Sequence, residues 1–244
     1  MSNTNGTHMM QFLYGWRDRR GRRAAIRFLG AFLVACGLAA TTTPAQAPQT
    51  LRIYLARHGE TEWNAQGRLQ GQSDIPLNAR GREQAALLGE TLKGIPIDAV
   101  YSSTLSRSRD TARIAGVHAP LKSLDGLREQ NRGRFQGMPN TDPEFVRRAN
   151  DPNDTLDGGE SLNQLTERAR VTLAQIRKEH PSGSVLIVGH TVTNQMILRV
   201  LLTLPVDEAA AIHQANDELY LIELGPGSDP RLWKLVRGKN LGDL

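Results

Sequence analysis

The sequence predicts a three-layer α/β/α sandwich with a mostly parallel central sheet. Short apolar runs of strand length alternate with longer segments of helical periodicity, which is the pattern of an α/β fold. Two of these runs, at residues 51–56 and 184–188, are each followed two residues later by a histidine. The 244 residues are 39% hydrophobic and 23% charged, which excludes a fibrous protein, a largely disordered chain and a multi-span membrane protein.

The first 47 residues carry the excess positive charge of the chain. The whole sequence has 30 Lys and Arg against 25 Asp and Glu, a net charge of +5. Six of the arginines and one acid, Asp18, lie in residues 1–47, which leaves 24 basic and 24 acidic residues in the rest. Because residues 48–244 are neutral as a whole, the charge does not indicate a nucleic-acid partner.

Residues 1–47 have the layout of a bacterial secretory signal peptide. An arginine cluster precedes an apolar run at 28–40, and small residues then end in Ala45 and Ala47. The run has 13 residues, which is short of the roughly 20 that a transmembrane helix needs. We therefore expect a cleaved signal over 1–47, one catalytic domain over 48–244, and export to the periplasm or the exterior.

The processing of this signal has two alternatives. Residues 33–36 resemble a lipobox, in which Cys36 is lipidated and becomes the new N-terminus. A cut after Ala45 or Ala47 is the other route, although Pro48 should hinder a protease that cuts directly before it. Membrane contact is expected only through the signal or through a lipid on Cys36. Because Cys36 is the only cysteine, the chain can form no internal disulfide.

The first half of the predicted domain begins with a strand at 51–56. Asn78 is a suitable N-cap for a helix that continues to residue 93, where Gly94 and Pro96 end it. The next elements are a strand at 99–102 and a helix near 107–115.

The second half begins with the clearest helix signal of the chain. Ser161 and Gln164 form a capping box ahead of an apolar stripe, and residues 181–183 break the helix. The elements that follow are a strand at 184–188, a helix that ends at 202, and two antiparallel or edge strands at 219–224 and 232–236.

His58 and His190 are predicted to lie at one edge of the sheet. Each follows the carboxyl end of a strand, and in such sheets ligands bind beyond those ends. Residues 133–159 are rich in Asp, Asn, Pro and Arg, and we expect them to form a loop-rich excursion over the same edge.

A series of short motifs accompanies these elements. It reads Arg57-His58-Gly59-Glu60-Thr61-Glu62-Trp63-Asn64, Gly67-Arg68-Leu69-Gln70-Gly71, Asp74-Ile75-Pro76-Leu77-Asn78, Ser102-Ser103-Thr104-Leu105-Ser106-Arg107, Leu127-Arg128-Glu129, Gly158-Gly159-Glu160-Ser161 and Val188-Gly189-His190. In this order, over nearly all of residues 51–224, the motifs resemble those of the histidine phosphatase superfamily, also called the phosphoglycerate mutase-like family, and its phosphatase branch.

The residues themselves suit phosphoryl transfer, which needs a nucleophile and positive charge around the phosphoryl oxygens. A neutral imidazole at His58 can attack phosphorus and form a phosphohistidine. The resemblance implies that Arg57, Arg107 and His190 clamp the phosphoryl group with up to three positive charges. It also implies that Glu129 is the proton donor, a role that works best with a pKa raised toward neutrality.

The remaining substrate-binding predictions are less direct. The resemblance implies that Asn64 contacts the phosphate, and Gln70 and Thr191 lie near the site by their sequence position. The expected ligand is a small phosphorylated substrate. Neither a metal nor a cofactor is expected.

The sequence departs from the family pattern at several positions. Asn131 and Phe135-Gln136 stand where relatives often have acidic or aromatic-acidic residues, and Thr191-Val192 replaces a common Gly-Gly. A group of arginines in and before the excursion forms either a solvated face or an attractive surface for an anionic substrate: Arg128, Arg132, Arg134, Arg147 and Arg148.

The favoured activity is hydrolysis of a phosphomonoester. Only 31 positions separate Glu129 from Glu160, whereas mutases of the family carry a long insertion there. Phosphoglycerate mutase activity is one alternative, and a catalytically silent phosphate-binding protein is another. The presence of both His58 and Glu129 favours the enzymatic interpretations over the silent one.

Overall fold

The computed structural model describes residues 50–236. The predicted signal at 1–47 and the alternative lipidation site at Cys36 lie outside the described residues, so these stay predictions. Within 50–236, none of the helices has both the length and the apolar composition needed to cross a membrane.

A six-stranded sheet forms the centre of the domain, with the strand order β3-β2-β4-β1-β5-β6. The strands β3, β2, β4 and β1 are mutually parallel, while β5 runs antiparallel to β1 and β6 antiparallel to β5. The predicted mostly parallel sheet with antiparallel late strands is therefore confirmed. The strands are β1 (Leu51–Arg57), β2 (Ala99–Ser103), β3 (Leu121–Leu124), β4 (Gly183–Gly189), β5 (Glu218–Leu224) and β6 (Arg231–Val236).

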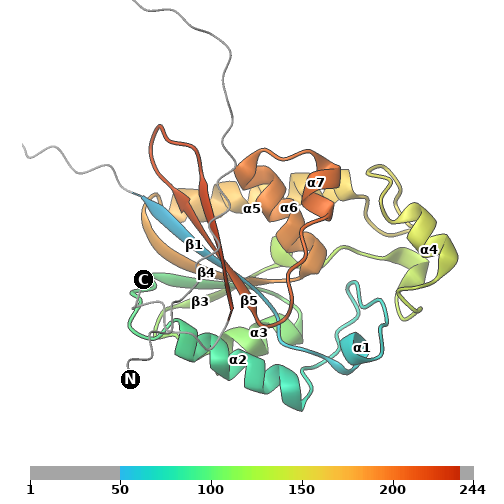
Figure 1. The fold of residues 1–244 in the computed structure, drawn as a ribbon, viewed down its shortest axis with the longest axis horizontal. Helices are drawn as coiled ribbons and strands as arrows, with labels where there is room; N and C mark the ends of the chain where they lie inside the picture. The colour runs from blue at the N-terminus through green and yellow to red at the C-terminus, as the bar shows by residue number, and fades with distance from the viewer. Residues whose placement is uncertain (1–49, 237–244) are drawn as a thin grey trace, which may run out of the picture. The chain divides into compact units, whose positions relative to one another are not determined.

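Helices cover both faces of this sheet and complete the predicted three layers (Figure 1). One layer holds α2 (Ala79–Thr91) and α3 (Ser106–Ile114), and the other holds α5 (Leu162–Glu179), α6 (Thr191–Leu202) and α7 (Val206–Ala210). Because strand side chains alternate between faces, β1 contributes Ile53 and Leu55 to the core beneath α5 and α6, and Tyr54 and Ala56 to the core beneath α2 and α3.

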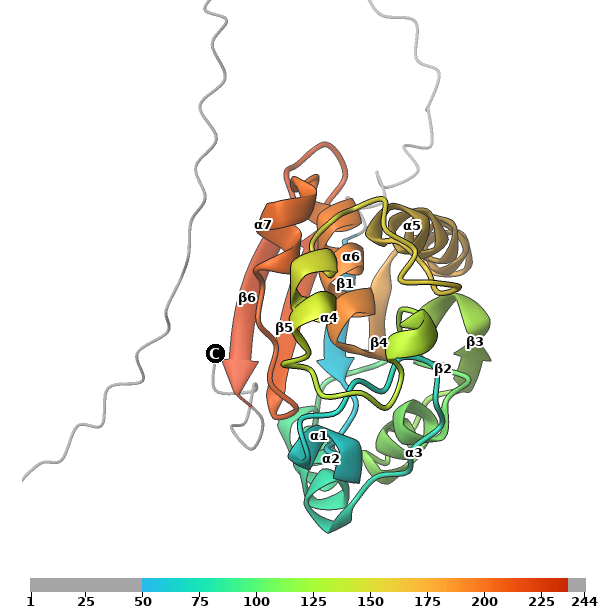
Figure 2. The same cartoon turned by 90° about the vertical axis from the view of Figure 1, so that its right-hand side faces the viewer.

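The predicted excursion is more ordered than its composition indicates. It contains a 3-10 turn η2 (Gly133–Phe135) and the helix α4 (Pro143–Arg148), and it packs on a small core of its own: Leu69, Phe135, Phe145 and Leu156. Together with the short helix α1 (Glu62–Ala65), α4 lies at the end of the domain toward which β1 points (Figures 1 and 2). The excursion thus stands at the predicted edge of the sheet.

The strand β3 and its following 3-10 turn η1 (Asp125–Leu127) were not expected from the sequence. Three of the four β3 residues are exposed, because the strand lies at the edge of the sheet. An exposed edge strand needs neither an apolar run nor clear alternation, and these are the signals on which a strand prediction depends.

The loop after β1 passes very close to the start of α2. A Cβ atom on Gly59 would lie 2.2 Å from the Gly81 carbonyl oxygen, and one on Gly81 would lie 2.0 Å from the Glu60 carbonyl oxygen. No side chain fits at either position, so glycine at both lets the loop pack against the helix. This packing fixes the backbone that carries His58.

Candidate active site

His58 and His190 meet at the carboxyl edge of the sheet. In the parallel pairing of β1 with β4, Arg57 stands opposite Gly189, and the His58 amide donates to the Gly189 carbonyl at 3.0 Å. The two imidazole rings are 5.0 Å apart between centroids and both are buried. The strand register therefore brings together two histidines that are 132 positions apart in sequence.

The backbone fixes the tautomer of His58. Its Nδ1 atom lies 2.7 Å from the Gly59 carbonyl oxygen. A carbonyl oxygen can only accept, so Nδ1 carries the proton and the lone pair of the neutral ring is on Nε2. The side-chain amide of Asn216 also donates from Nδ2 to the His58 carbonyl at 2.7 Å, which fixes the same backbone from the loop before β5. The Nε2 atom is thus the nucleophilic nitrogen of His58.

Two arginines bring positive charge to this edge. Arg107 is fully buried, and its Nη2 and Nη1 atoms donate to the carbonyls of Gly71 and Ser73, both at 2.7 Å. Arg57 donates from Nη1 to the Gln214 carbonyl at 3.1 Å. Burial lowers the pKa of Arg57 and lowers that of Arg107 to about 10, while the Glu129 carboxylate opposes both shifts. Arg107 therefore stays charged at neutral pH.

His190 differs from the expectation of a third positive charge. Burial lowers its pKa well below the ordinary value of histidine, and the charge of Arg107 lowers it further. The imidazole is therefore neutral at neutral pH when the site is empty. Its Nε2 lies 2.7 Å from the Ser103 hydroxyl, and its Nδ1 is buried without a hydrogen-bond partner among the described residues. The positive charge of the predicted clamp thus comes from Arg57 and Arg107.

The Glu129 carboxylate lies against the N-terminus of α6. Its oxygens accept from the backbone N–H groups of Gln130 at 2.9 Å, Thr193 at 3.1 Å and Val192 at 3.3 Å. The first turn of a helix has amide groups without intrahelical partners, and its dipole favours a negative charge. Val192, one of the two residues that replace the common Gly-Gly, therefore supplies a backbone donor to the predicted proton donor, and its neighbour Thr193 supplies another.

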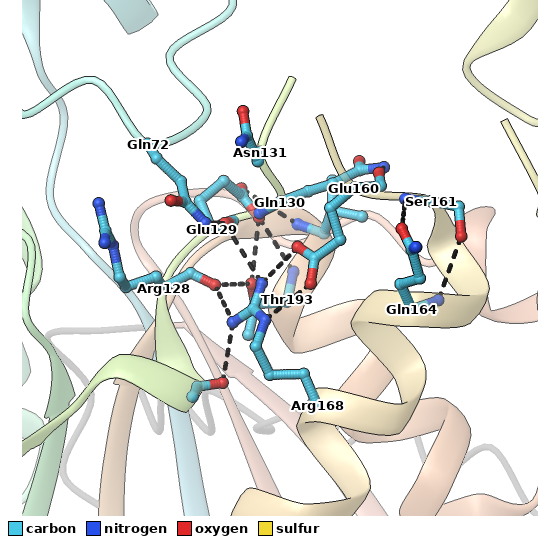
Figure 3. Close-up of polar contacts among 12 residues, drawn as sticks. Gln72, Arg128, Glu129, Gln130, Asn131, Glu160, Ser161, Gln164, Arg168 and Thr193 are labelled. Atoms are coloured by element: carbon cyan, nitrogen blue, oxygen red, sulfur yellow. Dashed lines mark hydrogen bonds and ion pairs between the residues drawn. The ribbon is translucent and has the colours of Figure 1, made fainter. Parts of the chain in front are cut away.

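Arg168 holds the backbone on which Glu129 sits (Figure 3). Its guanidinium forms a bidentate pair with Glu160, at 2.6 and 2.8 Å, and donates to the carbonyls of Gly126 and Arg128 at 3.0 and 2.8 Å. A planar guanidinium can make all of these contacts at once. Glu160, which belongs to the Gly-Gly-Glu-Ser motif, therefore acts through Arg168 in the described structure.

Thr193 supplies a further contact to the same segment. Its hydroxyl donates to the Arg128 carbonyl at 2.8 Å and lies 3.2 Å from Glu129 Oε1. We expect Thr193→Val to lower the free energy of unfolding by about 1–2 kcal/mol, because a buried carbonyl and a carboxylate oxygen lose a hydroxyl partner. Thr193→Ser keeps the hydroxyl and is the control. Equal urea midpoints for the Val variant and the wild type would show that this hydroxyl contributes nothing.

Asn64, Gln70 and Thr191 are the other residues predicted to bind the substrate. Asn64 uses Oδ1 in the capping box of α1, where it accepts from the Thr61 amide at 3.2 Å. Gln70 is buried on the loop whose carbonyls hold Arg107, and its Oε1 has no partner among residues 50–236. Thr191 is the first residue of α6, directly after His190. These contacts are compatible with phosphate binding by Asn64, Gln70 and Thr191, but they do not test it.

Several supporting residues were missed by the sequence analysis. They are Ser103, which contacts His190; Arg168 and Thr193, which hold the Glu129 segment; and Gln214 and Asn216, which hold Arg57 and His58. Ser103 belongs to the motif at residues 102–107 and is the last residue of β2. The others carry no motif, because their contacts depend on the tertiary fold.

Within residues 50–236, no group of three or more His, Cys, Asp or Glu side chains is placed to hold a metal ion. The expectation that no metal takes part stays a prediction, which addition of a chelator to an activity assay would test.

The site thus combines two histidines, two arginines and a carboxylate at the carboxyl edge of a three-layer α/β sandwich, an arrangement suited to phosphoryl transfer. Comparison with known families agrees. Residues 53–236 match the family model of the histidine phosphatase superfamily (branch 1), and the chain belongs to this superfamily.

Its relatives include proteins named as phosphatases and proteins named as probable phosphoglycerate mutases. The chain is 38% identical over 140 residues to the uncharacterized phosphatase PhoE of Bacillus subtilis, with 57% of this chain and 70% of the relative covered. It is 38% identical over 169 residues to the probable phosphoglycerate mutase GpmB of Citrobacter koseri, with 64% and 76% covered. The solved structure of a mycobacterial glucosyl-3-phosphoglycerate phosphatase aligns with a TM-score of 0.65 at 27% identity, covering 79% of this chain and 100% of that one.

Proposed function

We propose that the protein is a phosphomonoesterase that hydrolyses a small phosphorylated substrate through a phosphohistidine on His58. The observation that carries this proposal is the contact of His58 Nδ1 with the Gly59 carbonyl at 2.7 Å. That contact directs the lone pair to Nε2, in a ring that lies beside His190. A neutral imidazole held in one tautomer is ready to attack without first losing a proton.

The first step transfers the phosphoryl group to His58. Arg57 and Arg107 neutralise the phosphoryl oxygens, and the buried Nε of Arg107 and Nδ1 of His190 lack partners among the described residues. A bound anion would relieve the cost of these unpaired nitrogens. His58 Nε2 forms a bond to phosphorus, the bond from phosphorus to the leaving oxygen breaks, and Glu129 gives its proton to that oxygen.

The second step releases inorganic phosphate. Water attacks the phosphohistidine, its proton passes to the Glu129 carboxylate, and the bond from phosphorus to Nε2 breaks. The proton taken from water replaces the one that Glu129 gave to the leaving oxygen, so the cycle returns His58 and Glu129 to the states in which it began. The three backbone donors on the Glu129 carboxylate keep it in one place for both steps.

Phosphoglycerate mutase activity is the second candidate, because one relative at 38% identity is a probable phosphoglycerate mutase. A mutase must retain a phosphorylated intermediate while it turns over. Only 31 positions separate Glu129 from Glu160, and this segment includes the short helix α4 rather than a long insertion. This short excursion favours access of water, and therefore hydrolysis.

A phosphate-release assay separates these candidates. We expect the purified protein to release phosphate from 4-nitrophenyl phosphate and from some sugar, amino-acid or glycerate phosphates, with no change on addition of a chelator. Isomerisation of 3-phosphoglycerate faster than phosphate release would favour the mutase. Binding of phosphate esters without any turnover would favour the catalytically silent interpretation, and loss of activity with the chelator would contradict the expected independence from metal.

A further inference from the structure

The arginines in and before the excursion divide into two groups by their partners. Arg134 pairs with Glu144 and with Asp157, the latter at 2.6 Å. Arg148 pairs with Asp154 at 2.7 Å and with Asp157 at 2.9 Å. Their guanidinium carbons also lie 4.3 and 5.5 Å from the Phe135 ring centroid. These two arginines are thus neutralised by carboxylates and hold the excursion together.

Arg132 has no such carboxylate. Its side chain makes no hydrogen bond or ion pair within the described part of the chain, and its guanidinium carbon lies 5.0 Å from the Phe145 ring centroid. It keeps some exposure to solvent. Burial lowers its pKa, whereas the Glu129 carboxylate raises it, so the guanidinium is within electrostatic reach of the predicted proton donor. A cation held on an aromatic ring, without a counterion, is ready to bind an anion.

The aliphatic part of the Arg132 side chain packs beside the predicted phosphate clamp. A Cβ atom on Gly71 would lie 3.0 Å from Arg132 Cγ, and the Gly71 carbonyl accepts from Arg107 Nη2 at 2.7 Å. Arg132 therefore packs on the loop that holds Arg107. Arg107 belongs to the predicted phosphate clamp. Arg132 and Arg107 both contact Gly71, so only one residue separates their side chains.

Arg128 adds a second cation that forms no ion pair with any carboxylate in the described part of the chain. Its carbonyl is held by Arg168 and Thr193, both at 2.8 Å, which fixes its backbone. Its side chain extends away from the Arg168–Glu160 pair, on the side where Gln72 lies (Figure 3). The Nε atom is buried without a partner among residues 50–236. The charge of Arg128 also contributes to lowering the pKa of Arg107, so the two guanidiniums are within electrostatic reach.

We propose that Arg132, assisted by Arg128, binds a second anionic group on the alcohol part of the substrate. The substrate class is a phosphomonoester whose alcohol carries a carboxylate or a second phosphate. Both groups match the donor fork of a guanidinium, and partial burial strengthens the interaction. This inference rests on the proposed function, because it names the substrates that the same site prefers.

The test compares three esters: 3-phosphoglycerate, fructose 1,6-bisphosphate and glycerol 3-phosphate. Their alcohol parts carry a carboxylate, a second phosphate and no charge, respectively. The comparison therefore shows which of the two anionic groups is recognised, with an uncharged alcohol as the reference. In Arg132→Met an unbranched apolar side chain can still cover Phe145. We expect kcat/KM for the preferred anionic ester to fall by about 10- to 100-fold relative to glycerol 3-phosphate, since a hydrogen bond to a charged group is lost.

Arg147→Met is the matched control, because Arg147 is an exposed arginine on α4. It should leave the ratio of the rates unchanged, while Arg132→Lys should give an intermediate ratio because it keeps the charge but loses the fork. An unchanged ratio in Arg132→Met, or an equal loss on all three esters, would overturn the proposal.

A binding measurement distinguishes an error in the proposed subsite from an error in the proposed function. Calorimetry with a His58→Asn variant measures the affinity for 3-phosphoglycerate, fructose 1,6-bisphosphate and glycerol 3-phosphate without turnover. If the wild type releases no phosphate, the subsite still predicts tighter binding of at least one anionic ester, and loss of that preference when Arg132→Met is added. Equal affinity for all three esters would refute the subsite whatever the reaction.

Discussion

Replacement of His58 by asparagine is expected to lower the rate of phosphate release by roughly 10⁴-fold or more, as for loss of a catalytic nucleophile. The asparagine amide can still donate to the Gly59 carbonyl, which His58 Nδ1 contacts at 2.7 Å. It has no counterpart to the Nε2 lone pair, so it cannot form a bond to phosphorus. The measurement is kcat for 4-nitrophenyl phosphate, with circular dichroism to confirm that the variant is folded.

The matched control is His118→Asn, because His118 is exposed. It should keep the activity of the wild type. Rapid quenching with a ³²P-labelled substrate should show label on the wild-type protein that is stable to alkali and lost in acid, as expected for a phosphohistidine, and no label on His58→Asn. Turnover by the His58 variant at the wild-type rate, or label retained by it, would refute the nucleophile assignment.

The sheet and the meeting of the two histidines could be predicted from the sequence for a physical reason. Buried parallel strands need apolar runs, and the runs before His58 and His190 are both nearly fully buried. Strand ends in a parallel sheet share one edge, so the positions of the histidines followed from two local patterns. The strand β3 gave no such pattern, because its residues are exposed at the edge of the sheet.

The surroundings of the site could not be predicted in the same way. Thr193 contacts Glu129 from 64 positions away, and Gln214 contacts Arg57 from 157 positions away. Such contacts depend on how α6 and the loop before β5 pack, and no local periodicity encodes them. The charge of His190 is a similar case, because burial and the neighbouring Arg107 determine it, and both depend on the fold.

The arginines of the excursion also show that amino-acid composition alone does not predict which charged side chains are paired. Arg134 and Arg132 are two positions apart and chemically identical, yet among residues 50–236 only Arg134 finds carboxylate partners. Those partners are on α4 and in the segment that follows it, and they reach Arg134 because the excursion folds on its own small core. A single interpretation for all five arginines is therefore wrong, and each arginine has to be assigned by its contacts.

Glu129→Gln is expected to separate the two steps of the proposed reaction. For an alkyl phosphate, kcat should fall by about 10²- to 10⁴-fold, because the leaving alkoxide needs a proton from Glu129. The 4-nitrophenolate ion leaves without protonation, so phosphoryl transfer to His58 should stay comparatively fast. Release of phosphate should still be slow, because the variant also lacks the base for water. We therefore expect a burst of nitrophenolate of about one equivalent per enzyme, followed by a slow steady state.

The contacts of Glu129 make this variant a fair test of chemistry rather than of folding. Oε1 accepts from Gln130 and Thr193 at 2.9 and 3.1 Å, and a glutamine carbonyl can keep both bonds. The amide nitrogen then replaces Oε2, whose only donor within residues 50–236, the Val192 backbone N–H, is at the longer distance of 3.3 Å. Glu167→Gln is the control, since Glu167 is 68% exposed on α5 and pairs only with Arg170 among the described residues. Equal losses for the alkyl and the nitrophenyl ester, with no burst, would mean that Glu129 only positions the start of α6 and donates no proton.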